Sequence, residues 1–344
     1  MVKSATIAAM ALIGVVALSS QPPTAPAFAA LPDWPALPSQ WRLGDVSSVA
    51  VDAQQHIWLL HRPRTLPREQ WAAAAPPVLE FDTAGKFIQG WGGPGAGYEW
   101  PQREHGLHID HKGFVWIGGN NDPTRKLPGL DPVYDDQILK FTRQGRFVMQ
   151  FGRSNSSRGN DDTANFHMPA DTYVYPPTNE LFVADGYGNN RVIVVDADTG
   201  RFKRMWGAFG RAPKAGPDAF DTVHTVRVSN DGLVYVADRG HKRVQVFTLQ
   251  GRYLREMVLN RPSEGLVARS LAFSADRAQQ YLYIGGTPEI IVVDRQTLGI
   301  VSTIEPANPH HIATAANGDI YSAELAVGRG IQKFLFKGLV PIAK

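Results

Sequence analysis

Short runs in which apolar and polar residues alternate recur along most of the chain, between turns rich in Gly, Asp and Asn. Alternation with a period of two predicts half-buried β-strands. The runs fall into six units, whose first strands begin with DVSSVAVD (Asp45), EHGLHID (Glu104), PADTYVY (Pro169), VHTVRVS (Val223), ARSLAFS (Ala268) and PHHIATA (Pro309). A second and a third strand follow in each unit, so the pattern predicts an all-β chain.

Each unit is a short antiparallel meander that cannot bury both of its faces alone. Six such units around an axis predict a six-bladed β-propeller with blades of about four antiparallel strands. The last unit lacks a fourth strand, and we expect residues 34–44 (WPALPSQWRLG) to supply it and close the ring. Insertions at 63–77, 120–136 and 153–168 lengthen the loops, and the first two are expected to form a rim over one face.

The N-terminus has one lysine, an apolar run and then Ala27-Phe28-Ala29, which is the layout of a secretory signal peptide. We therefore expect a signal peptide at 1–29, a single propeller domain at 30–344, and a secreted or periplasmic protein. No later run reaches membrane length, so no membrane contact is expected after cleavage. The absence of cysteine excludes thiolate metal ligands, and a net charge of +3 with mixed signs gives no reason to expect nucleic acid.

One position in the first strands carries a histidine in every second unit. Aligning the strands places these residues at equivalent positions: Ser47, His105, Ala170, His224, Arg269 and His310. Inner strands run beside the propeller axis, so three imidazoles from alternate blades would meet at one point, as in a zinc site with an open fourth position. The alternative is that these histidines cap backbone groups or line a wet channel.

Tyr187 and Arg239 follow the second strands of units three and four, and Arg62 occupies the same place in unit one. These positions lie on the face where the histidines begin. In such a site a metal would polarise an oxygen, the arginines would hold a carboxylate and the tyrosine would act as a base. The alternative is that Tyr187 fills a loop whose turn is purely structural.

The units resemble NHL repeats. The segments EHGLHIDHKGFVWI, VHTVRVSNDGLVYVADRGHKRVQVF and NPHHIATAANGDIY, together with the tripeptide DGY at Tyr187, resemble the catalytic core of peptidyl-α-hydroxyglycine α-amidating lyase. This resemblance implies a propeller that holds zinc and cleaves a carbinolamide C–N bond, releasing a peptide amide and glyoxylate. It implies that the zinc ligands are His105, His224 and His310, that Tyr187 is catalytic, and that Arg62 and Arg239 are the paired active-site arginines.

The family also has a structural calcium, held by two backbone carbonyls and an aspartate. The carbonyls would belong to Val46 and Leu107, but this chain has His311 where the aspartate is expected, which puts the calcium in doubt. The expected partner is a peptide or small molecule with a carboxylate, such as another small carbinolamide or hydroxy acid. Two other functions stay open: a non-catalytic secreted NHL propeller that binds a protein, peptide or glycan, and a lactonase-like hydrolase.

Overall fold

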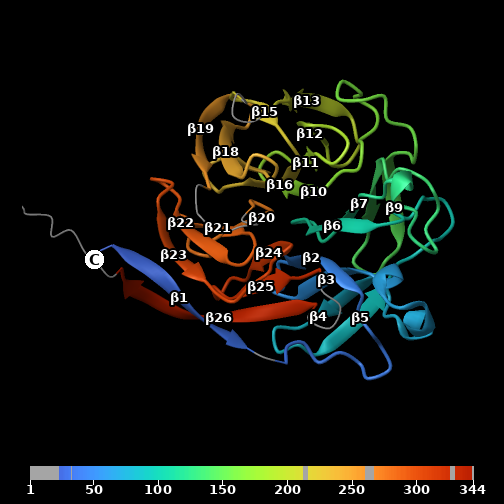
Figure 1. Cartoon of the computed structure of the whole chain (residues 1–344), viewed down its shortest axis with the longest axis horizontal. Coiled ribbons are helices and arrows are strands. Elements are labelled where there is room, and N and C mark those ends of the chain that lie inside the picture. The colour runs from blue at the N-terminus through green and yellow to red at the C-terminus, as the bar shows by residue number, and fades with distance from the viewer. Residues whose placement is uncertain (1–22, 32, 212–215, 260–266, 326–329, 343–344) are drawn as a thin grey trace, which may run out of the picture.

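Six four-stranded antiparallel sheets surround a common axis in the computed structural model (Figure 1). The structure describes residues 23–31, 33–211, 216–259, 267–325 and 330–342. The prediction of an all-β, six-bladed propeller is confirmed. Within the described residues, no helix is long and apolar enough to span a bilayer.

Strand order within each blade runs from the axis outward. The inner strands are β2 (Asp45–Val51), β6 (Glu104–Ile109), β10 (Asp171–Tyr175), β16 (Val223–Val228), β20 (Ser270–Phe273) and β24 (His311–Thr314). The second strands are β3 (Ile57–Arg62), β7 (Val115–Gly119), β11 (Glu180–Asp185), β17 (Leu233–Asp238), β21 (Tyr281–Gly285) and β25 (Ile320–Ala323). All of these inner strands begin inside or directly beside the segments predicted from the alternation.

The outer half of each blade completes the meander. The third strands are β4 (Val78–Phe81), β8 (Gln137–Phe141), β12 (Arg191–Asp196), β18 (Arg243–Thr248), β22 (Ile290–Asp294) and β26 (Ile331–Pro341). The fourth strands are β5 (Phe87–Trp91), β9 (Phe147–Gly152), β13 (Phe202–Trp206), β19 (Tyr253–Val258), β23 (Ile300–Ile304) and β1 (Thr24–Leu31). A small parallel pair, β14 (Ala208–Phe209) and β15 (Ala219–Phe220), lies outside the blades.

Apolar side chains from neighbouring blades pack against each other and form the core. Between the first two blades, Trp58 and Leu60 contact a cluster that includes Val115 and Ile117. The indole N–H of Trp58 donates to Asp52 at 2.8 Å, and the equivalent bond in the second blade joins Trp116 to Asp110. A buried tryptophan therefore keeps its polar group paired while its ring fills the space between blades.

The ring is closed by a segment upstream of the one that we expected. Strand β1 pairs antiparallel with β26, from Thr24 opposite Pro341 to Leu31 opposite Lys333. Residues 34–44 instead lie over the first and last blades, where Trp34 packs against Tyr321 with ring centroids 4.8 Å apart. The expectation that 34–44 supplies the closing strand is therefore wrong, although an N-terminal strand does close the ring.

Strand β1 includes the predicted signal cleavage site. Residues 1–22 of the predicted signal peptide lie outside the described residues, whereas Phe28 and Ala29 pair with the last blade and Ala27 lies at a register shift between them and Pro26. Phe28 contacts Tyr283 and Phe336, with ring centroids 5.9 and 5.8 Å apart. Cleavage after Ala29 stays a prediction, and it would remove most of β1.

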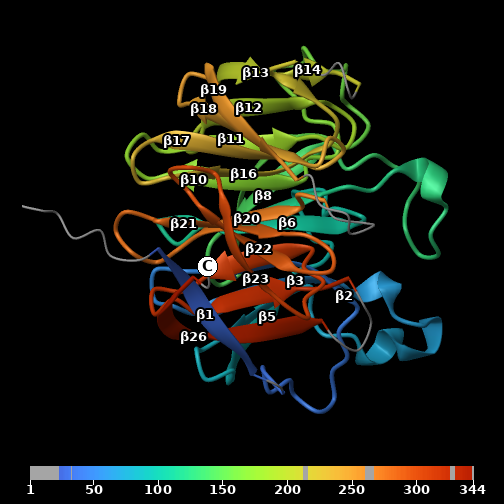
Figure 2. The same cartoon turned by 60° about the vertical axis from the view of Figure 1, so that its left-hand side comes forward.

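All three predicted insertions fall in the loops where the sequence placed them. The first contains the 3-10 helices η1 (Pro63–Thr65) and η2 (Arg68–Ala73), and the second contains η3 (Pro123–Arg125). Both project from the same side of the propeller in Figure 2. Residues of both insertions line one pocket, so they meet on one face as expected.

Buried His61 at the end of β3 holds the first insertion. Its Nδ1 accepts the Gly44 N–H at 3.2 Å, and its Nε2 contacts the carbonyls of Ala75 and Pro76 at 3.1 and 3.0 Å. These bonds require the neutral ring protonated on Nε2. Burial lowers the pKa of His61 from 6.5 to about 4.

A chain that begins at Ala30 should be less stable than one that begins at Gln21. It loses the Phe28 contacts and most of the pairing between β1 and β26, so we expect the free energy of unfolding to fall by roughly 3 kcal/mol. Urea unfolding of the two chains measures this difference, and Phe28→Ala in the longer chain should reproduce part of it. Equal stability would show that β1 does not close the ring. N-terminal sequencing of the exported protein would identify the cleavage site.

The free energy of unfolding should depend on pH through His61. Between pH 6.5 and about 4 the unfolded chain binds a proton on this ring that the folded chain does not, so stability falls as the pH falls. The contribution is up to about 1.4 kcal/mol per pH unit. Urea unfolding at pH 7 and pH 5 should show a smaller pH effect in His61→Gln, despite its lower stability at pH 7. The same pH effect in both chains would contradict the assignment.

Candidate metal centre

Three buried histidines meet at the axis where the inner strands begin. His105 lies on β6, His224 on β16, and His310 directly before β24. One nitrogen from each lies within 4.8 Å of the others, and the ring centroids are 4.7 to 5.0 Å apart. The structure thus brings together the three residues that the alternating repeat position singled out.

Each of these rings is oriented by a carbonyl of the next blade. The Nδ1 of His105 lies 2.7 Å from the Ala170 oxygen, that of His224 lies 2.6 Å from the Arg269 oxygen, and that of His310 lies 2.7 Å from the Ser47 oxygen. A carbonyl only accepts, so each Nδ1 carries the proton and each Nε2 keeps its lone pair. The three acceptors are the residues that occupy the same repeat position in the intervening blades.

Burial keeps these imidazoles neutral. It lowers the pKa of His224 to about 3, and it lowers the pKa values of His105 and His310 well below 6.5 with help from the neighbouring histidines. Neutral Nε2 atoms that converge on one point are the donor set of a tris-imidazole zinc site, and a fixed Nδ1–H bond is the usual support for such ligands. The residues therefore fit a zinc ion.

Tyr187 lies beside the three rings. Its hydroxyl oxygen is 2.9 Å from Nε2 of His105 and 3.0 Å from Nε2 of His224. The loop after β11 reaches this position because both flanking residues are glycines. A Cβ on Gly186 would lie 2.1 Å from the Val223 oxygen, and one on Gly188 would lie 1.6 Å from the His167 ring. Side chains at these two positions would push the loop, and the tyrosine with it, away from the histidines.

The two predicted arginines lie near the three histidines, and they differ in how their guanidinium groups are held. Arg239 has one guanidinium nitrogen 3.5 Å from the Tyr187 oxygen. Arg62 is buried at the end of β3, and its Nε donates to the backbone carbonyl oxygen of Glu104 at 2.7 Å. Within the described part of the chain, both terminal nitrogens of Arg62 lack a hydrogen-bond partner. Burial and the charge of Arg103 lower the pKa of Arg62 to about 9, which leaves it charged at neutral pH and suited to bind an anion.

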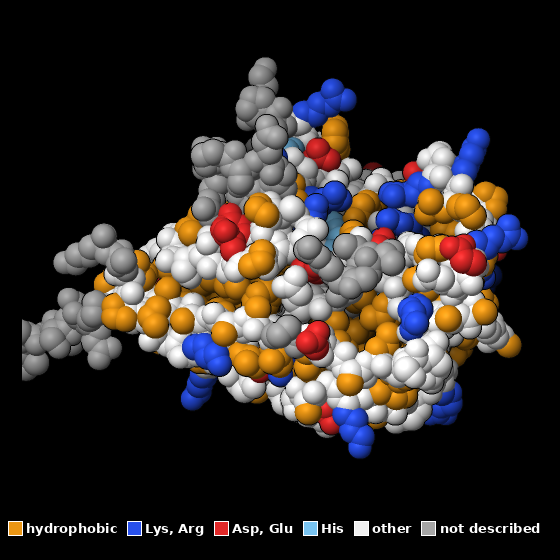
Figure 3. Space-filling model, turned by 60° about the horizontal axis from the view of Figure 1, so that its bottom comes forward, with side chains coloured by type: hydrophobic (Ala, Val, Ile, Leu, Met, Phe, Trp, Pro, Cys, Tyr) orange, Lys and Arg blue, Asp and Glu red, His pale blue; other side chains and the backbone are white. Residues whose placement is uncertain are grey.

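Two further arginines near the site were not predicted as functional. Arg103 donates to the Asn120 side chain at 2.7 Å, and Arg269 donates to Thr287 at 2.5 Å. Burial lowers the pKa of each, and both interact electrostatically with Tyr187. Arg269 occupies the same repeat position as the histidines, and this position in the sequence could have identified it as a site residue. In the space-filling view, basic side chains gather around a hollow in which a histidine is visible (Figure 3).

Further along the channel, the side chains do not fit the calcium of the resembling family. Arg227 forms an ion pair with Asp171, and its other terminal nitrogen lies 2.9 Å from Nε2 of His311. The Nδ1 of His311 bonds the Val49 oxygen at 3.0 Å. A guanidinium already neutralises the buried carboxylate here, and imidazole nitrogen is a poor ligand for calcium. No calcium enters the proposed function.

A second group of possible ligands lies in the first blade, where Asp52, His56 and Glu80 come together. Arg143 already binds this group, through an ion pair with Asp52 at 2.6 Å and another with Glu80. Its guanidinium occupies the position that a metal ion would need. The three histidines therefore form the stronger candidate among the described residues.

Comparison with known proteins matches the NHL repeat family to residues 220–247. The chain is 29% identical over 217 residues to mouse NHL repeat-containing protein 3, covering 61% of this chain and 53% of that protein. It is 24% identical over 326 residues to Xenopus laevis peptidyl-glycine alpha-amidating monooxygenase A, covering 88% of this chain and 32% of that protein. Thus the chain spans about half of the first relative and a third of the second.

A third relative is similar in length to this chain. The chain is 26% identical over 313 residues to a Caenorhabditis elegans protein named "Probable peptidyl-alpha-hydroxyglycine alpha-amidating lyase", covering 83% of this chain and 81% of that protein. The repeat match, the six blades and these relatives agree with the resemblance seen in the sequence. The chain is a six-bladed β-propeller with an NHL repeat, and it is similar in sequence to the amidating lyases.

Proposed function

We propose that this protein is a zinc-dependent lyase that cleaves the C–N bond of an N-acyl-α-hydroxyglycine, releasing an amide and glyoxylate. The observation that carries the proposal is the convergence of three neutral imidazoles, the Tyr187 hydroxyl and Arg62, whose two terminal nitrogens have no hydrogen-bond partner among the described residues. A propeller that only binds a partner has no need for buried guanidinium nitrogens without a hydrogen-bond acceptor. A lactonase-like site would favour carboxylates, whereas the inner ring offers imidazoles.

The arginines would bind the substrate carboxylate. Arg62 is fixed through Nε by the Glu104 oxygen, so its two free nitrogens face the ligand in one orientation. Arg239 is held near the Tyr187 oxygen and would contact the same anion or the developing charge beside it. The surrounding arginines raise the local positive potential, which favours a negatively charged substrate.

Tyr187 would move the proton. The reaction removes the proton of the carbinol hydroxyl, forms the glyoxylate C=O bond, breaks the C–N bond and adds one proton to the departing nitrogen. As the phenolate, the Tyr187 oxygen close to both His105 and His224 would accept the first proton, and the resulting phenol would return it to nitrogen. Zinc, when bound by the three histidines, would supply a Lewis acid for the hydroxyl oxygen.

We further propose a cellular location and a class of substrate. The signal-like N-terminus supports a secreted or periplasmic location. The expected substrate is a peptide or small molecule with a carboxylate, bound at the cationic end of the channel. The alternative, a non-catalytic propeller that binds a protein, peptide or glycan, is the reading that remains if the protein holds no metal.

Metal analysis tests the centre directly. The untagged protein should contain about one zinc per chain by elemental mass spectrometry, because three imidazoles form a complete protein ligand set. His224→Ala should lose it, while His111→Ala, which changes an exposed histidine in the turn after β6, should keep it. Absence of stoichiometric metal after zinc has been supplied would reject the lyase and favour the binding propeller.

Kinetics test the roles of Tyr187 and Arg62. With N-benzoyl-α-hydroxyglycine as substrate and glyoxylate as the measured product, Tyr187→Phe should lower kcat by about 10²- to 10⁴-fold, because it removes the proton-transfer group. Arg62→Met should raise KM by about tenfold or more, because a charged hydrogen bond to the carboxylate is lost. Arg146→Met, an exposed arginine before β9, is the matched control. The role of Tyr187 is wrong if its variant keeps the parent kcat, and the role of Arg62 is wrong if its variant keeps the parent KM.

A further inference from the structure

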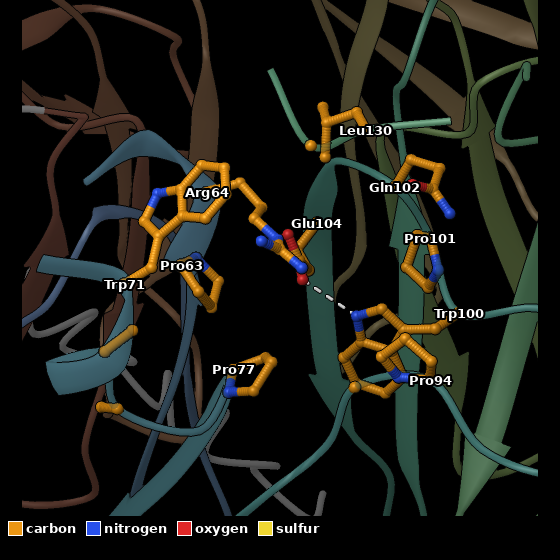
Figure 4. A pocket seen from close by; sticks show the side chains of 14 residues that line it. Pro63, Arg64, Trp71, Pro77, Pro94, Trp100, Pro101, Gln102, Glu104 and Leu130 are labelled. Carbon is orange, nitrogen blue, oxygen red and sulfur yellow. Dashed lines mark hydrogen bonds between the residues drawn. The ribbon is translucent and has the colours of Figure 1, made fainter. Parts of the chain in front are cut away.

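A cavity of about 310 Å³ lies between the first and second blades, and its walls come from three stretches of chain. These are the first insertion, the segment before β6 and the tip of the second insertion. Figure 4 shows Trp71 and Pro77 on one side of the space and Trp100 and Pro101 on the other. None of these residues has a role in the proposed reaction.

Chain continuity places this pocket beside the candidate metal centre. Pro63 and Arg64 in the wall directly follow Arg62, and Glu104 in the wall directly precedes His105. The bond from Arg62 Nε to the Glu104 oxygen, at 2.7 Å, joins the two sides. The pocket therefore adjoins the chain segments that carry Arg62 and His105.

Apart from Arg64, Gln102 and Glu104, the walls of the pocket are apolar. Four of the wall residues are prolines, at 63, 77, 94 and 101, and these lack an N–H. The indole N–H of Trp71 donates to the Leu66 oxygen and that of Trp100 to Glu104, both at 2.9 Å. The Trp100 ring, and the part of the Trp71 ring that Arg64 leaves uncovered, offer apolar surface to a ligand.

Each of the three polar side chains in the wall makes one contact there. Arg64 lies over the Trp71 ring, 4.5 Å from its centroid, and the Gln102 oxygen accepts the Asp131 N–H at 2.9 Å. Glu104 accepts the Trp100 N–H. The prolines restrict the backbone on both sides, so the pocket is formed before a ligand enters.

We propose that this pocket binds the apolar acyl group of the substrate, so that the enzyme prefers N-acyl-α-hydroxyglycines with an aromatic or large aliphatic group on the acyl side. This inference rests on the proposed function and names its substrate class. A cavity of about 150 Å³ holds benzene, so the space here accommodates one aromatic side chain together with the atoms that link it to the reacting amide.

Binding of unreactive analogues tests the pocket without turnover. N-acetylglycine and N-benzoylglycine both carry the carboxylate but lack the hydroxyl, so neither can be cleaved. Isothermal titration calorimetry with the zinc-supplied protein should give about 10- to 50-fold tighter binding of the benzoyl compound, because its ring buries more apolar surface. Trp71→Ala should reduce this preference to about threefold or less, as one wall is lost.

A second variant and a control separate the pocket from general damage. Ala74→Phe, which fills the space from the first insertion, should weaken binding of N-benzoylglycine and leave that of N-acetylglycine unchanged. Trp41→Ala removes a half-buried tryptophan that packs on Phe87 outside the pocket, and it should keep the full preference. Equal affinities in the parent, no measurable binding of either compound, or an unchanged preference in Trp71→Ala would overturn the inference.

Comparing kcat/KM for two substrates separates the role of the pocket from the lyase activity. If the pocket is correct, kcat/KM for N-benzoyl-α-hydroxyglycine exceeds that for the N-acetyl compound, and Trp71→Ala removes most of the difference. Glyoxylate release at equal kcat/KM from both compounds would keep the lyase and reject the pocket. A benzoyl preference in binding, with no glyoxylate from either substrate, would keep the pocket and reject the lyase.

Discussion

Hydrogen bonds between neighbouring inner strands determine the geometry of the whole site. Each of the three histidines points its Nδ1–H at a carbonyl of the next blade, and the bond from His310 to Ser47 joins the last blade to the first. A one-residue slip of an inner strand would turn its histidine away from the axis, since strand side chains alternate. The lone pairs at the axis therefore depend on the register of all six blades and on closure of the ring.

Charge is distributed in two layers along the channel. At the level of the histidines, neutral imidazoles are surrounded by arginines, one of which has no partner for its terminal nitrogens among the described residues. Deeper in the channel, Asp171 and Arg227 form a closed ion pair with His311 beside it. Among the described residues, the guanidinium nitrogens without a partner thus lie at the level of the histidines, where the proposed function would place the substrate carboxylate.

The scaffold and the insertions have different roles. The strands hold the histidines and place Arg62 at a strand end, where backbone bonds fix its direction. The first insertion, held by buried His61, and the tip of the second form one side of the apolar pocket, and the chain before β6 forms the other. In the proposed function the scaffold would supply the chemistry and the loops would select the substrate, a common division because loops vary without disturbing the core.

The sequence by itself determined the architecture and the identity of the central residues, because strand alternation and a repeat position are local patterns. The alignment of six strands was enough to single out His105, His224 and His310, and the repeat match and relatives agree with the overall fold. Only the tertiary structure decided what depends on contacts between distant segments. These include the carbonyls that hold the histidines, the terminal nitrogens of Arg62 that have no partner among the described residues, the pairing of Arg227 with Asp171, and the use of β1 to close the ring. The segment TAPAFAAL has no strand alternation of its own, and it becomes a strand because the open edge of β26 offers unpaired backbone groups.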